Sequence, residues 1–377
     1  MSRLILFSRN FPPLVGGIEG LMHSVFLCAR EDYEIVLIGP RGCRSYAEGA
    51  FRVYEMPVSI AGYLAASCFF IPYLLFRFKP ALVVGSNGLM GPLVAVLSKL
   101  AGSSSVCFVH GLDLIVENRV YRLLFLPCLK RIDTVIVNSK NTAVLALRAE
   151  LPVAAIKVIH PCIREPIPRV RTDAYFPSGR VSDDAPIIVY AGRIVPRKGL
   201  VEFLQECAGW LQSKNYKLVV AGDEPFGQAG PAAGAYIQRL RQTVEALELG
   251  DSIEFLGRVS EEQMASAFAR ATVHVMPLVE TSGDVEGFGM VAVEAASYGV
   301  PTVAFDVGGV KDALPSPQYL IPPGNYARLM AAVDSIAHSD VEPEDLTQWA
   351  KGFSMQAFRP KLLRVLSRTA VERTADN

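Results

Sequence analysis

Short apolar runs alternate with helical segments along the first half of the chain. Runs of four to six mostly apolar residues, typical of buried strands, are separated by segments long enough to form a helix. The predicted strands are residues 4–7, 34–38, 81–84, 106–109, 134–137 and 156–159. Because strands that alternate with helices form βαβ units, the pattern predicts an α/β domain with a parallel, doubly wound sheet. Ligands of such sheets bind beyond the carboxyl ends of the strands.

The same alternation starts again in the second half. The predicted strands there are residues 186–191, 217–221, 273–276 and 301–305, together with a strand and its turn over 253–259, and the last predicted helices are 328–336 and 358–366. Between the halves lies a segment with prolines, mixed charge and little periodicity, which indicates a linker. The predicted organisation is a domain over 1–165, a linker over 166–185, a domain over 186–355, and a helix and tail over 356–377, in which 369–377 are expected to fray.

A glycine-rich turn followed by a short helix is the most informative stretch of the chain. It runs from Gly283 to Pro301, and the helix is predicted over residues 290–298. The first turn of a helix has free backbone N–H groups and the positive end of the helix dipole, which suit a phosphate or a sugar hydroxyl. Glu286 in the turn and Glu294, about one helical turn into the helix, can face one pocket. This arrangement suits a polyhydroxylated ligand with a phosphate.

The E-G-F-G-x-x-x-x-E-A pattern that begins at Glu286 resembles the retaining glycosyltransferases of family 4, whose fold is called GT-B. The resemblance implies two facing Rossmann-like domains with a cleft between them and a last helix that crosses back to the first domain. It also implies that Glu286 and the backbone that follows hold the donor sugar and that Glu294 binds the ribose of the nucleotide. The backbone positions are Gly287, Phe288, Gly289 and Met290. By spacing alone, the pair of glutamates also fits a helix cap followed by an exposed helix residue.

A cationic turn follows the first strand of the second half. The residues G-R-x-x-x-x-K-G span 192–199, and Arg193 and Lys198 can together neutralise a diphosphate. Exposed cations near a strand end are common, but this pattern resembles the diphosphate clamp of family 4. Three further donor-site candidates lie in turns after later strands, where similar segments of the family cradle the base through the backbone: Gly222, Arg258 and Val259.

Two motifs of the first half match the same family. The loop P-P-x-x-G-G places Gly16 and Gly17 at the start of a helix, where their amides can contact a donor diphosphate, although a structural turn explains them as well. His110 ends a strand within an H-G-x-D motif, and the resemblance places it near the reacting sugar. Asp113 is a weaker candidate that also fits a helix cap, and Ser139 is expected to cap the next helix.

Composition excludes several classes of protein. The 377 residues are 51% hydrophobic and have no formal net charge, which argues against a disordered or nucleic-acid-coating protein. The seven cysteines include no C-x-x-C pair, which favours reduced thiols in the cytoplasm, and the opening apolar run is too short for a secretory signal. The G-x-G-x-x-G fingerprint of nicotinamide-binding enzymes does not follow the first strand.

The charge distribution and the hydropathy are compatible with a membrane contact but do not require one. Residues 1–165 contain 17 Lys and Arg against 11 Asp and Glu, and the remainder contains 20 against 26. A basic first half could lie on an anionic membrane or receive a phosphorylated acceptor, and scattered surface charge explains it equally well. Residues 59–76 are uncharged, which predicts a buried or membrane-facing helix rather than a transmembrane one, and residues 117–131 read as an amphipathic helix.

The resemblance to family 4, with the apolar helices and the basic first half, implies a retaining hexosyltransferase of envelope glycan biosynthesis. Its catalytic residues would be His110, Arg193, Lys198 and Glu286. The family implies a GDP- or UDP-linked sugar donor, with mannose favoured, and a lipid-linked saccharide, glycolipid or polysaccharide acceptor. We expect no metal, no separate cofactor and no nucleic-acid partner, and a cytoplasmic location with a peripheral position on the inner face of the membrane. The alternatives are a nucleotide-sugar epimerase of the same fold, which would form product without an acceptor, and a non-catalytic nucleotide-sugar-binding subunit.

Overall fold

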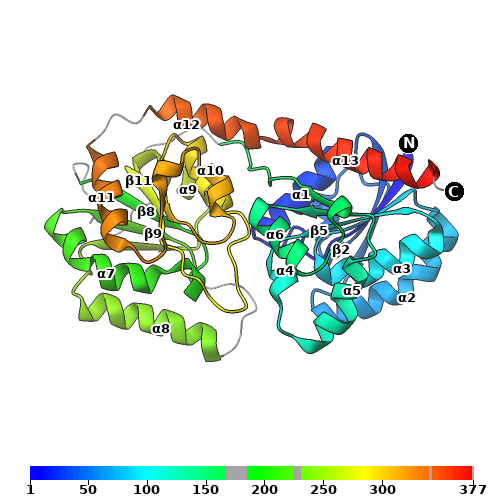
Figure 1. The fold of residues 1–377 in the computed structure, drawn as a ribbon, viewed down its shortest axis with the longest axis horizontal. Coiled ribbons are helices and arrows are strands. Elements are labelled where there is room, and N and C mark those ends of the chain that lie inside the picture. Colours follow the sequence, from blue (N-terminus) through cyan, green and yellow to red (C-terminus); the bar gives the residue numbers. More distant parts are fainter. Residues whose placement is uncertain (167–184, 224–230, 339–341, 376–377) are drawn as a thin grey trace. The chain divides into compact units, whose positions relative to one another are not determined.

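The computed structural model of the chain describes residues 1–166, 185–223, 231–338 and 342–375. The chain forms two compact units, which Figure 1 shows as ribbons. Unit 1 contains residues 1–163 together with 353–377, and unit 2 contains residues 164–352. The predicted linker lies almost entirely outside the described residues, which omit 167–184.

Unit 1 is built on a seven-stranded parallel sheet in the order β3-β2-β1-β4-β5-β6-β7. Its strands are β1 (Ser2–Phe7), β2 (Tyr33–Pro40), β3 (Arg52–Met56), β4 (Leu82–Gly85), β5 (Ser104–Val109), β6 (Thr134–Val137) and β7 (Ile156–Val158). In this register Phe7 of β1 pairs with Ile38 of β2 on one side and Gly85 of β4 on the other. All six strands predicted for this half are confirmed. The prediction missed β3, an edge strand with only one buried residue.

Helices cover both faces of this sheet. They are α1 (Gly17–Ala29), α2 (Ile60–Phe78), α3 (Gly91–Ala101), α4 (Leu112–Ile115), α5 (Leu126–Leu129), α6 (Lys140–Arg148) and α13 (Met355–Ala375), with short turns η1 (Cys43–Tyr46), η2 (Gly88–Met90) and η4 (Val153–Ala155). Helices α1 and α13 pack into the core on one face, whereas α2, α3 and α5 pack into the core on the other, as Figure 1 shows. The sheet is therefore the middle layer of three.

The predicted helix over residues 117–131 is confirmed over residues 119–129, which are helical without a break. A π-helical turn η3 (Tyr121–Phe125) runs directly into α5. Pro127 lies in the first turn of α5 and has no N–H to donate. Just before it, the N–H of Leu126 donates to the carbonyl of Tyr121, so the helix continues through one wider turn.

The prediction that residues 369–377 fray is wrong for the described part of that segment. Helix α13 continues to Ala375, and Thr369 is 5% exposed. Its Oγ1 lies 2.8 Å from Oγ1 of Thr134, and its carbonyl accepts a hydrogen bond of 2.8 Å from the Ser104 hydroxyl. Arg359, near the start of the same helix, also pairs with Asp32 of unit 1. The end of the chain is thus bonded to the first sheet, which is why 353–377 belong to unit 1.

Unit 2 repeats the architecture with a six-stranded parallel sheet in the order β10-β9-β8-β11-β12-β13. Its strands are β8 (Ile187–Ala191), β9 (Lys217–Ala221), β10 (Ile253–Gly257), β11 (Val273–Met276), β12 (Thr302–Phe305) and β13 (Leu320–Ile321). The five strands predicted for this half are confirmed, and the two-residue edge strand β13 was missed. Both units are therefore Rossmann-like, as expected for a GT-B fold.

The helices of unit 2 also lie on both faces of their sheet. They are α7 (Leu200–Ser213), α8 (Pro231–Ala246), α9 (Glu261–Arg270), α10 (Met290–Ser297), α11 (Tyr326–Ala337) and α12 (Pro343–Ala350), with turns η6 (Pro196–Lys198), η7 (Val310–Ala313), η8 (Pro317–Tyr319) and η9 (Lys351–Phe353). Helices α9 and α10 share one core with the sheet, and α7 and α8 lie on the opposite face in Figure 1. The predicted helix over 290–298 is confirmed as α10.

Candidate functional site

The predicted site residues lie at the carboxyl ends of parallel strands. In unit 2 the strand order changes direction between β8 and β11. Lys198 lies in η6, shortly after β8, and Glu286 lies in the loop that leads from β11 into α10. The crevice beyond a point where the strand order reverses is the usual ligand site of such sheets. The two residues therefore lie on either side of this point.

An ion cluster joins these two loops. Nζ of Lys198 lies 2.7 Å from Oε2 of Glu286, and Nη1 of Arg197 lies 2.5 Å from the same oxygen. Nε of Arg197 lies 3.0 Å from Oδ2 of Asp284. The side chains of Lys198, Arg197 and Glu286 are 9%, 7% and 12% exposed, so these charges are largely removed from water. Together with the exposed Arg193, the cluster has three cations against two carboxylates, which leaves an excess of positive charge at the sheet edge.

Burial and charge act in opposite directions on Glu286. Burial disfavours the ionised carboxyl, but the charges of Lys198 and Arg197 outweigh it and lower the pKa of Glu286 to about 2. For Lys198, burial lowers the pKa, and Glu286 opposes that change. The buried His274 on β11 contributes no cation, because burial and the charge of Lys198 lower its pKa to about 3. At neutral pH, Glu286 is therefore ionised between its two cationic partners.

Glycines shape the loop between Glu286 and α10. Gly289 is the N-cap of α10 with φ 95°, a conformation that other residues rarely adopt. The N–H of Gly309 donates to the carbonyl of Glu286 at 2.8 Å, and this holds the loop against the turn after β12. Phe288 is buried, whereas Gly287 and Met290 are partly exposed. The loop thus presents backbone and the first turn of α10 beside the ion cluster, where an anionic or hydroxylated group can bind.

Glu294 lies one turn into α10 and is partly exposed. Burial raises its pKa, and the charges of Arg164 and Lys198 oppose that change. A carboxyl that is costly to ionise gains from hydrogen-bond donors supplied by a ligand. Its position beside the cluster is consistent with a hydroxyl-binding role.

The ends of three adjacent strands are tied together by glycines. Gly192 donates to the carbonyl of Ala221 at 3.0 Å, and Gly222 donates to the carbonyl of Gly257 at 2.9 Å. A Cβ on Gly222 would collide with the carbonyl oxygen of Gly192. Gly222 therefore permits a close approach of two loops, and its N–H is already used within the protein. Arg258 and Val259 follow β10 at the same edge, with Arg258 exposed and Val259 partly exposed.

In unit 1, His110 follows β5 and is 9% exposed. Its Nε2 lies 2.8 Å from the carbonyl oxygen of Ser86. Because a carbonyl only accepts, Nε2 holds a proton, and Nδ1 is the acceptor when the ring is neutral. The His110 N–H donates to Oδ2 of Asp113 at 2.9 Å. Asp113 lies inside α4, whose N-cap is Gly111, so this carboxylate closes the turn behind His110 and is not a helix N-cap.

Polar side chains gather at the same edge of the first sheet. Gly16 is the N-cap of α1 and Gly17 its first residue. Asn10 donates to Glu19 at 2.7 Å, and Asn87 donates to Asn10 at 2.7 Å. These contacts place amides and carboxylates beyond β1 and β4, where the order of the first sheet also reverses. Ser139 caps α6 as predicted, since its hydroxyl accepts from the N–H of Thr142.

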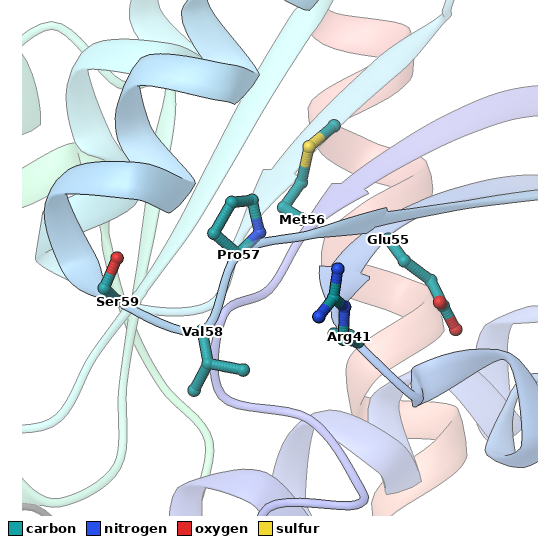
Figure 2. Close-up of a pocket in the computed structure, with 6 residues that line it drawn as sticks. All are labelled: Arg41, Glu55, Met56, Pro57, Val58 and Ser59. Carbon is teal, nitrogen blue, oxygen red and sulfur yellow. The ribbon is translucent and has the colours of Figure 1, made fainter.

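A hollow of about 400 Å³ opens beyond β2 and β3 in unit 1. Figure 2 shows the six residues that line it: Arg41, Glu55, Met56, Pro57, Val58 and Ser59. Arg41 directly follows β2, and its N–H donates to the carbonyl of Met56 at 2.9 Å. The hollow therefore lies at the ligand edge of its sheet and combines a cation, a carboxylate and a hydroxyl.

Sequence reasoning missed Arg197 as a site residue. It is adjacent to Lys198, and the sequence shows it only as one more cation in the turn. Its importance depends on contacts with Asp284 and Glu286, which follow it by almost ninety residues. The backbone also joins these loops, because Val279 donates to the carbonyl of Arg197 at 2.9 Å.

Part of the chain matches a known family model. Residues 171–353, less than half of the chain, match the model described as Glycosyl transferases group 1. The matched region contains η6, the loop with Glu286, and α10. The ion cluster therefore lies in the part of the chain that is similar to this family.

The chain is also similar to curated relatives and to solved structures. The chain is 25% identical to a GDP-mannose-dependent alpha-(1-6)-phosphatidylinositol monomannoside mannosyltransferase of Mycolicibacterium smegmatis, over 82% of each chain. It is 27% identical to a 2-deoxystreptamine N-acetyl-D-glucosaminyltransferase of Streptomyces fradiae over 56% of this chain and 48% of that protein. The fold matches the crystal structure of Anabaena Alr3699/HepE in complex with UDP-glucose, with a TM-score of 0.79, 18% identity and coverage of 98% of this chain and 100% of that chain. The fold is thus GT-B.

Proposed function

We propose that this protein is a retaining, metal-independent hexosyltransferase that uses a nucleotide-sugar donor and a lipid-linked saccharide, glycolipid or polysaccharide acceptor. The observation that supports this most strongly is the Lys198–Glu286 ion pair at the switch point of the second sheet, inside the group 1 region. Envelope glycan biosynthesis on the cytoplasmic side is the role that fits these substrates.

The donor diphosphate binds at the cationic excess of the cluster. Lys198 and Arg193 provide charge, and the amides at the start of α10 provide hydrogen bonds. Lys198 is already held in place by Glu286, so its ammonium needs little reorganisation to meet a phosphate. Arg197 keeps Glu286 ionised after Lys198 turns to the ligand, because it contacts the same carboxylate oxygen. Glu286 is then free to accept from sugar hydroxyls.

The transfer step needs no protein nucleophile. The bond between the anomeric carbon and the diphosphate oxygen breaks, and the acceptor hydroxyl forms its bond to the anomeric carbon on the same face. The acceptor proton passes to the departing phosphate oxygen, so the products are the glycoside and the protonated nucleoside diphosphate. Lys198 and Arg193 stabilise the charge that develops on the leaving group. His110 accepts from a sugar hydroxyl through Nδ1 and orients the donor.

The comparisons favour particular sugar donors, and the hollow in unit 1 favours a location for the acceptor. The mannosyltransferase relative favours GDP-mannose, and the structure with UDP-glucose keeps a UDP-hexose as the second donor class. We assign the acceptor to unit 1, where the hollow beside Arg41 and Glu55 has a volume suited to a saccharide. Arginine and carboxylate side chains provide both the donors and the acceptors that saccharide hydroxyls require.

A transfer assay with purified protein tests this function. GDP-mannose, UDP-glucose and related donors are incubated in EDTA with a bacterial lipid extract, and the released nucleoside diphosphate and the anomeric configuration of the product are measured. The proposal expects release only when acceptor is present, with retained configuration. Sugar isomerisation without acceptor would identify an epimerase, and donor binding without turnover would identify a binding subunit. Release only after magnesium is added would contradict the metal-independent mechanism.

A further inference from the structure

Helix α2 has an outward face that is apolar from Ile60 to Phe76 and ends at Arg77. The exposed apolar positions recur every three or four residues, as on one side of a helix. They are Ile60, Ala61, Ala65, Cys68, Phe69, Pro72, Tyr73 and Phe76. Phe69 and Phe76 are each 89% exposed, while Ser67 on the inward side is completely buried. An ordinary surface helix shows the opposite pattern, with charged residues outside. Core packing in unit 1 therefore does not explain the outward phenylalanines.

Neighbouring helices extend this apolar face. Helix α3 packs against both α2 and α5, and all three contribute to the core on the same side of the first sheet (Figure 1). On the outward side of α3, Leu100 is 63% exposed, and in η3 beside α5, Leu123 and Leu124 are 74% and 60% exposed. Large exposed apolar areas of this kind mark interaction sites. We call the outward side of α2, α3 and η3 the α2 face.

The charged residues within α2, α3 and η3 are all positive, whereas the exposed Glu117 lies shortly before η3. The sequence contains no aspartate or glutamate from residue 56 to 112, or from 118 to 132. The exposed cations in these segments are Arg77, Lys79, Lys99, Arg119, Arg122 and Arg131. A face with aromatic and leucine residues in the middle and lysine and arginine around them is complementary to the acyl chains and anionic headgroups of a bilayer. A second copy of the same face would bring cations against cations.

We infer that the α2 face is a monotopic membrane-docking surface for an anionic bilayer. Helix α2 is long and apolar enough to span a membrane by length and composition, and only 22% of its most apolar window is buried. It does not span one, however, because Tyr63, Leu74 and Phe78 are packed into the core of unit 1. The helix therefore lies in the interface plane, with Phe69 and Phe76 inserted below the headgroups. This inference rests on unit 1 alone and does not depend on the proposed transfer reaction.

Vesicle flotation tests the docking surface. Purified protein is mixed with vesicles of phosphatidylcholine alone or of equal parts phosphatidylcholine and phosphatidylglycerol, at low and high salt. We expect binding to the mixed vesicles that salt weakens, and a loss of about tenfold or more in the Phe69→Gln/Phe76→Gln variant. The Val153→Gln/Phe255→Gln variant, which removes two exposed apolar residues outside the α2 face, should bind like the wild type. Equal binding of the two double variants would overturn the inference.

Two further measurements distinguish membrane docking from self-association through the α2 face. Light scattering without vesicles reports self-association. If the wild type forms a dimer and binds no vesicles, and the Phe69→Gln/Phe76→Gln variant is a monomer, the α2 face binds a second copy and not a membrane. The Phe69→Trp variant reports insertion, because tryptophan emission shifts to shorter wavelength when the ring leaves water. The docking surface predicts that shift on addition of mixed vesicles, and unchanged emission contradicts it. Melting temperatures of all variants confirm that these exposed substitutions leave the fold intact.

Discussion

Lys198 and Glu286 form a buried ion pair of 2.7 Å between loops that follow strands on either side of a reversal in strand order. They are 88 positions apart in the sequence, and Arg197 contacts the same carboxylate oxygen. Removal of one member of a buried ion cluster leaves the others uncompensated, which is costly. The cluster therefore couples the stability of unit 2 to its charge state, and it positions an ammonium where a ligand phosphate can reach it.

The Glu286→Gln variant should be less stable than the wild type at neutral pH, and this difference should disappear in acid. The pKa of Glu286 in the folded protein is about 2, below the ordinary 4.5, so its ionised form stabilises the fold above pH 4.5 and that contribution is lost as the pH falls towards 2. The shift corresponds to about 3 kcal/mol at most. Urea unfolding of both proteins between neutral pH and pH 2 measures this difference in stability. The Glu280→Gln variant, which removes an exposed charge, is the control for the loss of one negative charge. A difference that does not change with pH would contradict this role.

The Glu294→Gln variant should have the opposite effect on stability. Burial raises the pKa of Glu294, so the folded state is penalised as the pH rises through that pKa, and an uncharged amide avoids this penalty. We expect a higher melting temperature near neutral pH. We also expect the nucleotide affinity to be about tenfold lower, because the variant loses a hydrogen bond to a charged group. Thermal melting and calorimetric titration of the same samples test both effects. A variant that is both less stable and unaltered in nucleotide binding would refute the assignment.

The Gly222→Ala variant should destabilise unit 2 because its Cβ would collide with the carbonyl oxygen of Gly192. Gly209→Ala is the matched control, since Gly209 lies in α7 with no atom within 4 Å of an added Cβ. A helical alanine should stabilise by about 0.5–1 kcal/mol relative to glycine. Thermal melting should therefore move in opposite directions for the two variants. Equal shifts would mean that the two strand ends are not in close contact.

The Thr369→Val variant should weaken the attachment of the C-terminal helix to unit 1. Valine has the same shape but leaves the hydroxyl of the buried Thr134 without its 2.8 Å partner, at a cost of about 1–3 kcal/mol. Hydrogen exchange in α13 and limited proteolysis should both accelerate. Ser367→Ala, whose hydroxyl bonds only to the preceding turn at Arg364, provides the control. Identical exchange in the two variants would argue against this contact as an anchor.

The apolar pattern of the sequence was sufficient to predict the inner strands, because buried parallel strands are continuous apolar runs. Helix α10 was predicted because glycines mark the turn before it. It was not sufficient for β3, whose polar edge residues have no such run, or for Thr369, a polar residue that is buried by pairing with other hydroxyls. The two motifs that contain Lys198 and Glu286 predicted them as site residues. They gave no indication that the two side chains are in contact. Arg197 was missed because its role arises only when distant loops meet.

The most direct test of the account is calorimetric titration of nucleoside diphosphates and the matching nucleosides into the wild type and the Lys198→Met variant, in EDTA. GDP and UDP are compared with guanosine and uridine. The account predicts that the diphosphate tightens binding to the wild type by about tenfold to a hundredfold for one of the two bases, as expected for charged hydrogen bonds, and that the variant loses this gain. If the variant binds the diphosphate as tightly as the wild type does, or if the wild type binds neither nucleotide, the ion cluster is not a donor site.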